Sequence, residues 1–507
     1  AMWAPAAPVP PVTSALTTSR RLAVPFAQQG ASALRTFAAS IVVLNTLRRW
    51  RQSVGKVAVR SRSTDLQRRW DVLQSKILET ESAKELRRID REVAEGRRCH
   101  PDTKVRFFSE GREMPRVTFY RDSSALCPNC QAVWLLLEAK EIDYVVVKED
   151  LRAYGQKSEA FLKKVPNGSL PAVVVDGRVT TNSLDAMFLL ERLYPDPEKP
   201  MFPSFSRLRS TALQLLELHR AVFGAWSTYM FREERPFVSE SRVEFQTALE
   251  QVEKALEKSD SAWFLPYEHP TIVDIQYVCS IERMVASAMF FKAEDLRDFQ
   301  SIDRWLRAFE DLPWYQATKG DYYSLCMALK PRHGTPLGRN HRIRDELMPE
   351  NYTLPFKFER DVEALTRQDF TARIHHVEAS WSLLKNCDAV AHYCCRAAGG
   401  QQGLWAKGRA DRSTLADPQA AVLESLLVPV ELLLCTIAEE IFAESPAEQV
   451  RLRVREAVKA VPGLEPQLAV CLAYLRDRIG VPRDLPLPTA KVLRSYLSEA
   501  CMELRRK

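Results

Sequence analysis

The sequence predicts one α/β domain near the middle of the chain, followed by regions that are helical throughout. Between residues 116 and 200, β-branched segments and segments of helical periodicity follow one another in the order β-α-β-α-β-β-α. From 205 to 323, and again after 372, apolar residues recur at helical spacing without strands. The order β-α-β-α-β-β-α is the thioredoxin-like arrangement, so the predicted fold class is an α/β domain with an all-α continuation.

The elements of the α/β domain follow from periodicity and from turn residues. Strands are expected at 116–121, 144–148, 172–175 and 178–180, and helices at 127–140, 154–164 and 183–194. Asp176-Gly177 separates the last two strands and suits a tight hairpin turn. Pro195 closes the unit, because proline does not continue a helix.

The rest of the chain divides at loops and at helix boundaries. Thr271 can cap a helix that starts at residue 272, and Asp274 can reach back in a capping box. Further helices are expected at 372–398, 418–442, 447–461, 464–479 and 489–506. The expected domains are 1–64 (targeting segment), 65–115 (helical linker with an amphipathic helix to residue 98), 116–200 (α/β domain), 201–329 (all-helical domain), 330–371 (linker) and 372–507 (helical extension of unknown role).

The first 64 residues differ in composition from the rest. They contain nine Lys and Arg residues and no Asp or Glu, which is typical of an organellar transit segment. A disordered basic arm is the alternative. The remainder holds 63 basic and 65 acidic residues (72 less nine, against 65), so its net charge is close to neutral and gives no reason to expect a nucleic-acid partner.

Cysteine usage and hydropathy restrict the class of protein further. Eleven cysteines in 507 residues is too sparse for a disulfide scaffold, and an odd number fits a reducing compartment. The most apolar stretch, 421–442, is broken by Glu424, Pro429 and Glu431. We therefore expect a buried helix there and no membrane span.

The segment Cys127-Pro128-Asn129-Cys130 follows a predicted strand and opens a predicted helix. A thiol at a helix N-terminus faces unpaired N–H groups and the positive end of the helix dipole, and both favour its thiolate. Cys127 is therefore the expected nucleophile, while Cys130, one turn later, either resolves a mixed disulfide or packs. Half of a zinc site is the alternative, but no second cysteine pair has suitable spacing, so no metal is expected.

The adjacent His375 and His376 lack a metal-binding spacing and are expected to pack or to lie on the surface.

A resemblance to the glutathione transferase superfamily appears after this motif. It rests on "VPNGSLP" at 165–171 and "TNSLDAMFLLERLYP" at 181–195, covers 116–200 well and extends loosely to about 325. The CPxC segment resembles the cysteine-type branches (omega, lambda and dehydroascorbate-reductase-like) and glutaredoxins. "CPNCQAVWL" at 127–135 is similar to "CPYCQKVWL" of glutathione-transferase-like proteins of plant and algal plastids, which favours a plastid over a mitochondrion.

The resemblance implies a glutathione site. It implies that Pro171 is cis and that the backbone of Leu170 pairs with the cysteinyl backbone of glutathione. Asn182 and Ser183 stand where the family holds the γ-glutamyl end, and Asn182 replaces the usual acid, which we expect to weaken binding by about 1 kcal/mol. Lys157 stands where a basic residue often meets the glycine carboxylate, and a solvated surface charge is its alternative.

The function implied is a glutathione-dependent thiol transferase or reductase, because a cysteine at this place forms a mixed disulfide with glutathione. The expected partners are glutathione, as co-substrate, and a small oxidised or electrophilic substrate held between the two domains, with a homodimer as a further expectation. Two alternatives stay open. One is a scaffold that retains the transferase fold without catalysis, and the other is conjugation of glutathione to electrophiles.

Overall fold

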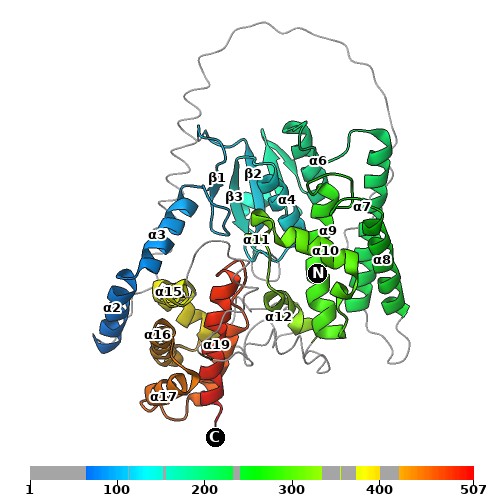
Figure 1. Cartoon of the computed structure of the whole chain (residues 1–507). Helices are drawn as coiled ribbons and strands as arrows, with labels where there is room; N and C mark the ends of the chain where they lie inside the picture. Colours follow the sequence, from blue (N-terminus) through cyan, green and yellow to red (C-terminus); the bar gives the residue numbers. More distant parts are fainter. Residues whose placement is uncertain are drawn as a thin grey trace, which may run out of the picture. The chain divides into compact units, whose positions relative to one another are not determined.

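The computed structural model describes residues 64–111, 113–151, 156–231, 240–333, 354, 373–399 and 422–506. Residues 69–507 form one compact unit, and residues 5–68 form a second, of which only 64–68 are described. Figure 1 shows the order of the elements. The predicted targeting segment and most of the predicted linker at 330–371 lie outside the described residues, so both assignments stay predictions.

Two helices stand where the sequence suggested one amphipathic helix at 65–98. They are α2 (Thr64–Leu78) and α3 (Glu81–Ala94). The single helix was wrong because Thr80 breaks it: its hydroxyl donates to the carbonyl of Ile77 at 2.7 Å and accepts from the N–H of Ala83 at 3.1 Å. A side chain that caps the next helix competes here with continued helical hydrogen bonding.

A five-stranded sheet forms the centre of the α/β domain. Its strands are β1 (Val105–Arg106), β2 (Val117–Asp122), β3 (Tyr144–Glu149), β4 (Ala172–Val175) and β5 (Arg178–Thr180). Their spatial order is β1-β3-β2-β4-β5, with β2 parallel to β3 and the other pairs antiparallel. Four strands lie within a residue of their predicted positions. The two-residue β1 was not predicted, because so short a segment carries no alternation of apolar and polar residues.

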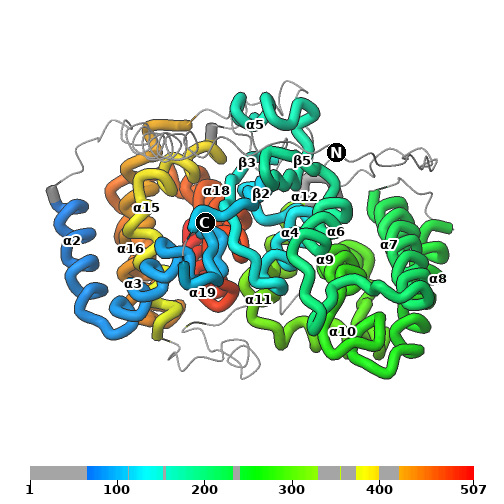
Figure 2. The backbone as a smooth tube through the Cα atoms, turned by 90° about the horizontal axis from the view of Figure 1, so that it is seen from above, coloured from blue at the N-terminus to red at the C-terminus, as the bar shows by residue number. Residues whose placement is uncertain are grey.

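Helices cover both faces of this sheet. Helices α4 (Pro128–Ala139) and α6 (Ser183–Leu193) share a core with Val117 and Phe119, whereas Tyr120, the next residue of β2, faces Phe161 of α5 (Glu159–Lys164). Figure 2 shows α5 on the side of the sheet opposite to α4 and α6. The alternation of side chains along β2 therefore sets the three layers, and every residue of α4 except Asn129 is buried.

The helical domain is built around α9 (Ile272–Ser287), all of whose residues except Gln276 are buried. The helices around it are α7 (Ser206–Phe231), α8 (Glu240–Glu257), α10 (Gln300–Glu310), α11 (Pro313–Gln316) and α12 (Tyr322–His333). Helix α9 packs against α4, α7 and α12. The predicted capping box is present at its start, where the Asp274 carboxylate accepts from the N–H and the hydroxyl of Thr271, each at 2.8 Å.

The predicted helical extension is a group of packed helices. They are α15 (Arg373–Gly399), α16 (Leu427–Phe442), α17 (Ala447–Val458), α18 (Glu465–Arg476) and α19 (Leu487–Leu504). Arg494 of α19 is buried and makes an ion pair with Asp321, just before α12, so the extension contributes to a core shared with the helical domain. Within the described ranges, every helix is too short or too polar to traverse a lipid bilayer.

Candidate functional site

Cys127 lies between the end of β2 and the start of α4, as the sequence predicted. Its backbone is extended (φ −74°, ψ 117°), it is the N-cap residue of α4, and its carbonyl accepts the N–H of Gln131 at 3.0 Å. Pro128 occupies the first turn, where its missing N–H costs nothing. Cys127 is half-buried, so its thiol lies at the N-terminal end of the helix dipole and keeps access to solvent.

Cys130 provides a second, different thiol. It is 2 % exposed, and its sulfur, the Cys127 sulfur and a carboxylate oxygen of Asp122 all lie within 4.8 Å of one another. Burial raises the pKa of Cys130 well above its ordinary value, and the hydrogen bond that it gives to Cys127 raises it further. Cys130 thus keeps its proton and lies where it can share it with the Cys127 sulfur. Both cysteines are free thiols.

Asp122 is a site residue that the sequence analysis missed. It is the last residue of β2 and is 1 % exposed. Its Oδ2 accepts from the Ser124 hydroxyl at 2.8 Å, from the N–H of Leu126 at 2.8 Å and from the N–H of Cys127 at 3.2 Å. One buried carboxylate therefore shapes the loop that presents Cys127. An acidic residue five positions before CxxC at the end of a strand was the signal that could have identified it.

The turn before β4 has the geometry expected of a glutathione-binding loop. The Leu170–Pro171 peptide bond is cis, which confirms the expectation drawn from the resemblance. Gly168 has φ +65°, a conformation that residues with a side chain rarely adopt. A Cβ at Gly168 would lie 3.2 Å from Cδ and Cε of Lys157. Pro171 is buried and Leu170 is half-buried, so the Leu170 backbone lies at the edge of the sheet core.

Asn182 and Ser183 open helix α6. The Asn182 side-chain oxygen accepts the N–H groups of Leu184 at 2.9 Å and Asp185 at 3.1 Å, so both of its acceptor positions serve as the helix cap. The Ser183 hydroxyl lies 3.4 Å from the side-chain oxygen of Asn129, within the CxxC segment. The starts of α4 and α6 are therefore joined by a direct contact between Ser183, a predicted site residue, and Asn129, which lies between the two cysteines.

Lys157 is held by the backbone. Its Nζ donates to the carbonyl of Asp150 at 2.7 Å. Burial lowers its pKa, while Glu149 and the Cys130 sulfur favour its charged form. The amine therefore lies within electrostatic reach of the CxxC pair. It is only partly exposed, unlike the solvated surface charge that was the alternative.

A buried polar network from the helical domain supports the start of α4. Gln131 donates to the Glu282 carboxylate at 3.1 Å, and Glu282 also accepts from the Tyr315 hydroxyl at 3.1 Å and from the N–H of Gly320 at 2.9 Å. Arg283 donates to the carbonyl of Leu126 with Nε at 3.2 Å and with Nη2 at 3.1 Å. Helix α9 thus fixes the loop that carries Cys127, and periodicity alone could not have predicted these contacts.

The adjacent histidines are packing residues, as expected. His376 is 1 % exposed, and Nδ1 of His375 lies 3.1 Å from the hydroxyl of Thr489. Burial lowers the pKa of His375 to about 4, so it is neutral at ordinary pH. Neither histidine joins a cluster with metal-ligand geometry among the described residues.

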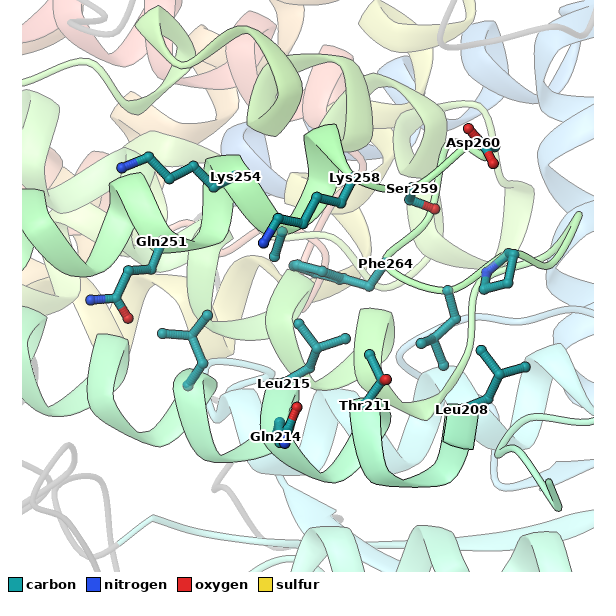
Figure 3. A pocket seen from close by; sticks show the side chains of 14 residues that line it. Leu208, Thr211, Gln214, Leu215, Gln251, Lys254, Lys258, Ser259, Asp260 and Phe264 are labelled. Carbon is teal, nitrogen blue, oxygen red and sulfur yellow. The ribbon is translucent and has the colours of Figure 1, made fainter. Parts of the chain in front are cut away.

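A cavity of about 560 Å³ lies elsewhere in the helical domain, between α7, α8 and the segment that leads to α9. Figure 3 shows Leu215 and Thr211 on one side, Lys258 on the other, and the ring of Phe264 between them. None of the predicted site residues lines this cavity. The acceptor pocket that we expect between the two domains therefore stays a prediction.

Comparisons with known proteins agree with this geometry. A family model described as "Glutathione S-transferase, N-terminal domain" matches residues 126–193. The chain is 32% identical over 149 residues to "Glutathione S-transferase DHAR2" of Arabidopsis thaliana, which covers 29% of this chain and 62% of that protein. It is 30% identical over 207 residues to "Probable maleylacetoacetate isomerase" of Caenorhabditis elegans, which covers 37% of this chain and 87% of that protein.

Solved structures of similar proteins cover the same part of the chain. The dehydroascorbate reductase of Chlamydomonas reinhardtii is 20% identical and aligns over 43% of this chain and 98% of its own, with a TM-score of 0.36. An epsilon-class glutathione S-transferase of the housefly Musca domestica is 22% identical over 43% of this chain and 99% of its own, with a TM-score of 0.37.

Proposed function

The chain belongs to the glutathione transferase superfamily, and from this membership we propose that it is a glutathione-dependent thiol transferase or reductase whose nucleophile is Cys127. The observation that carries the proposal is the pairing of two unequal thiols. Cys127 is half-buried at the start of α4, and Cys130 is buried and protonated beside it. A serine or tyrosine at the position of Cys127 would hold a glutathione thiolate by a hydrogen bond, whereas a cysteine can form a disulfide with it.

The reaction proceeds in two exchanges. The Cys127 thiolate attacks the glutathione sulfur of a mixed disulfide R–S–S–G, so the S–S bond of the substrate breaks and R–S⁻ leaves with the electron pair and is protonated. A second glutathione thiolate then attacks the glutathione sulfur held on Cys127. Oxidised glutathione leaves and the Cys127 thiolate is restored, so one free glutathione thiol is consumed for each mixed disulfide reduced, because the other glutathione sulfur comes from the substrate itself.

Residues around the two sulfurs have separate parts in this scheme. The Leu170 backbone beside the cis Pro171 pairs with the cysteinyl part of glutathione, while Ser183 and Lys157 are the expected partners of its two carboxylate ends. Cys130 offers a second route, in which its sulfur attacks Cys127 and releases glutathione. Its raised pKa makes this route slow near neutral pH, so we propose that the second glutathione is the main reductant.

Turnover of a small glutathione mixed disulfide tests the proposal. Wild-type protein is incubated with reduced glutathione and the mixed disulfide of glutathione and 2-mercaptoethanol, and the release of oxidised glutathione is followed with glutathione reductase and NADPH. We expect Cys127→Ser to abolish turnover and Cys130→Ser to keep the first exchange. Cys326→Ala, which removes a buried thiol of α12, is the matched control and keeps full activity. An inert wild type, or an active Cys127→Ser variant, contradicts the proposal.

A scaffold without catalysis is the second candidate, and one observation favours it. Both acceptor positions of the Asn182 side-chain oxygen serve the cap of α6, so the γ-glutamyl ammonium of glutathione must compete with two backbone N–H groups there. Calorimetric titration of glutathione into the Cys127→Ser variant separates the two functions. Measurable binding supports the enzyme, and the absence of binding together with an inert wild type supports the scaffold.

The compartment is also a proposal. The acid-free composition of residues 1–64 and the similarity of the CPNC segment to plastid proteins support import into a plastid. Expression of the full chain as a fluorescent fusion in an algal or plant cell tests this. We expect fluorescence in the plastid, and loss of that signal when residues 1–64 are removed.

A further inference from the structure

The peptide unit between Leu126 and Cys127 is held on both sides by buried charged residues. Its carbonyl oxygen accepts two hydrogen bonds from the Arg283 guanidinium, at 3.2 Å and 3.1 Å. Its N–H donates to the carboxylate of Asp122 at 3.2 Å. The cation thus contacts the oxygen of the peptide unit and the anion contacts its N–H, which matches the peptide dipole at both ends. The residue that follows this peptide unit carries the proposed nucleophilic sulfur.

The two charged residues come from different domains. Asp122 ends β2 of the α/β domain, and Arg283 belongs to α9 of the helical domain. Both are almost fully buried, at 1 % and 2 % exposed. The remaining amine of Arg283 donates to the side-chain oxygen of Gln131 at 2.5 Å and to the carbonyl of Cys279 at 2.7 Å, so the guanidinium is fixed by four acceptor contacts on two helices and the loop.

The position of Asp122 gives it a second effect. Its carboxylate lies within 4.8 Å of both cysteine sulfurs, and a negative charge at that distance opposes the formation of a thiolate. A loop that needed only to be ordered could use a neutral acceptor instead. The carboxylate thus places a negative charge beside the Cys127 sulfur, while Arg283 supplies a positive charge on the other side of the same peptide unit.

We propose that Asp122 and Arg283 are paired positioning residues that fix the Leu126–Cys127 peptide and act with opposite signs on the reactivity of the Cys127 thiol. The inference rests on the proposed function, in which Cys127 is the nucleophile. Through Arg283, the helical domain takes part in the chemistry of the α/β domain. A variant in the helical domain can thus change the thiol without touching glutathione.

Other ionisable groups face the same sulfurs and are unchanged in the test. On α9 the group is Cys279. The Glu282 carboxylate on the same helix lies 3.7 Å from the Arg283 guanidinium. The ionisable group on α4 is Cys130, and the one that precedes α5 is Lys157. Because Glu282 offsets part of the charge of Arg283, we expect the effect of removing Arg283 to be smaller than the effect of removing the charge of Asp122.

The rate of alkylation of Cys127 by iodoacetamide as a function of pH tests the proposal without glutathione or turnover. It is measured by peptide mass spectrometry in the full chain carrying Cys130→Ser, so that only one sulfur of the segment reacts. Asp122→Asn keeps an acceptor oxygen and loses the charge. We expect it to move the midpoint of the profile to lower pH, because a nearby negative charge that opposes the thiolate has been removed.

Arg283→Met is expected to move the midpoint in the opposite direction, and the double variant is expected to lie between the two. Arg494→Met, which removes another buried ion-paired guanidinium, is the matched control and leaves the midpoint where it is. Shifts of the same sign in both site variants, no shift in Asp122→Asn, or an equal shift in Arg494→Met overturn the proposal. If Arg283→Met does not fold, the sign of the Asp122→Asn shift decides.

The proposed function can fail separately from this inference. If the midpoints move as expected but wild-type protein does not turn over a glutathione mixed disulfide, the inference about Asp122 and Arg283 is correct and the enzymatic proposal is wrong. If turnover is present and the midpoints do not move, Cys127 is catalytic and the inference about Asp122 and Arg283 is wrong.

Discussion

At the scale of single residues, Gly168 shows how backbone geometry and the glutathione loop depend on each other. Its φ of +65° strains any residue with a side chain, and a Cβ there would also require the Lys157 side chain to shift. We expect Gly168→Ala to lower the free energy of unfolding by about 1–2 kcal/mol, since a left-handed conformation costs an alanine roughly 1–2 kcal/mol. We also expect weaker glutathione binding, because Lys157 must move.

Urea unfolding and calorimetry measure these two effects, and Gly177→Ala is the matched control. Gly177 has φ +82°, but a Cβ there would meet open space. It should cost similar stability and leave glutathione affinity unchanged. Equal loss of affinity in both variants would show that Lys157 is not the cause.

The single residue His219 predicts how stability depends on pH. Burial lowers its pKa to about 4, and its ring nitrogen lies 2.9 Å from the hydroxyl of Ser280. An unfolded histidine has a pKa near 6.5, so between pH 6.5 and 4 the unfolded chain binds a proton that the folded chain does not. Above pH 6.5 the histidine does not lower the free energy of unfolding. As the pH falls below 6.5, the free energy of unfolding decreases, by about 3 kcal/mol at pH 4.

Unfolding in urea at pH 7 and pH 5 checks this slope. His219→Gln removes the titrating group and should give a smaller difference between the two pH values than the wild type does. A variant with the same difference as the wild type would show that other groups cause the acid sensitivity.

At the scale of elements, the start of α9 depends on one buried carboxylate. Asp274 is fully buried and accepts from the N–H of Phe264 at 2.9 Å and from the indole N–H of Trp305 at 3.1 Å, besides its two bonds to Thr271. We expect Asp274→Ala to lower the free energy of unfolding by about 3 kcal/mol, because four buried donors lose their acceptor. Thermal unfolding measures this, and a loss below about 1 kcal/mol would contradict it.

The elements also show how far sequence patterns predict this molecule. Both hairpin strands, 172–175 and 178–180, were predicted at their observed bounds, because β-branched residues flank an Asp-Gly turn. The start of α4 was likewise predicted, and the cis Pro171 was implied by the family resemblance. Periodicity could not predict Arg283 as a site residue, because its contact with Leu126 joins segments far apart in the sequence. Asp122 contacts its near neighbours, and it was missed although an acid at a strand end before CxxC is a readable signal. The interruption at Thr80 was missed because its capping hydroxyl competes with a helical pattern that continues through it.

At the scale of the whole molecule, the extension and the helical domain share a buried polar contact. Arg494 donates to Asp321 and, with Nη2, to the Ser324 hydroxyl at 2.9 Å and to the carbonyl of Ile479 at 2.7 Å. Helix α3, from the other end of the described chain, packs against α15 of the extension. The extension is therefore part of the folded structure of residues 69–507, whatever partner it binds.

A double-mutant cycle tests that statement. Arg494→Met leaves Asp321 buried without its cation, so we expect a loss of about 3–5 kcal/mol, as for other broken buried pairs. Asp321→Asn combined with Arg494→Met should be less destabilised than the sum of the two single variants, because no buried charge is left. Additive losses, measured by urea unfolding, would show that the pair does not join the two regions.

The formation of a glutathione disulfide on Cys127 tests the central claim most directly. The Cys130→Ser variant is incubated with oxidised glutathione, and the modified peptide is identified by mass spectrometry. We predict one glutathione on Cys127, released by a reductant and absent when Cys127 is also replaced by serine. An unmodified Cys127, or equal modification of Cys99, would contradict the claim that the start of α4 selects this sulfur for reaction with glutathione.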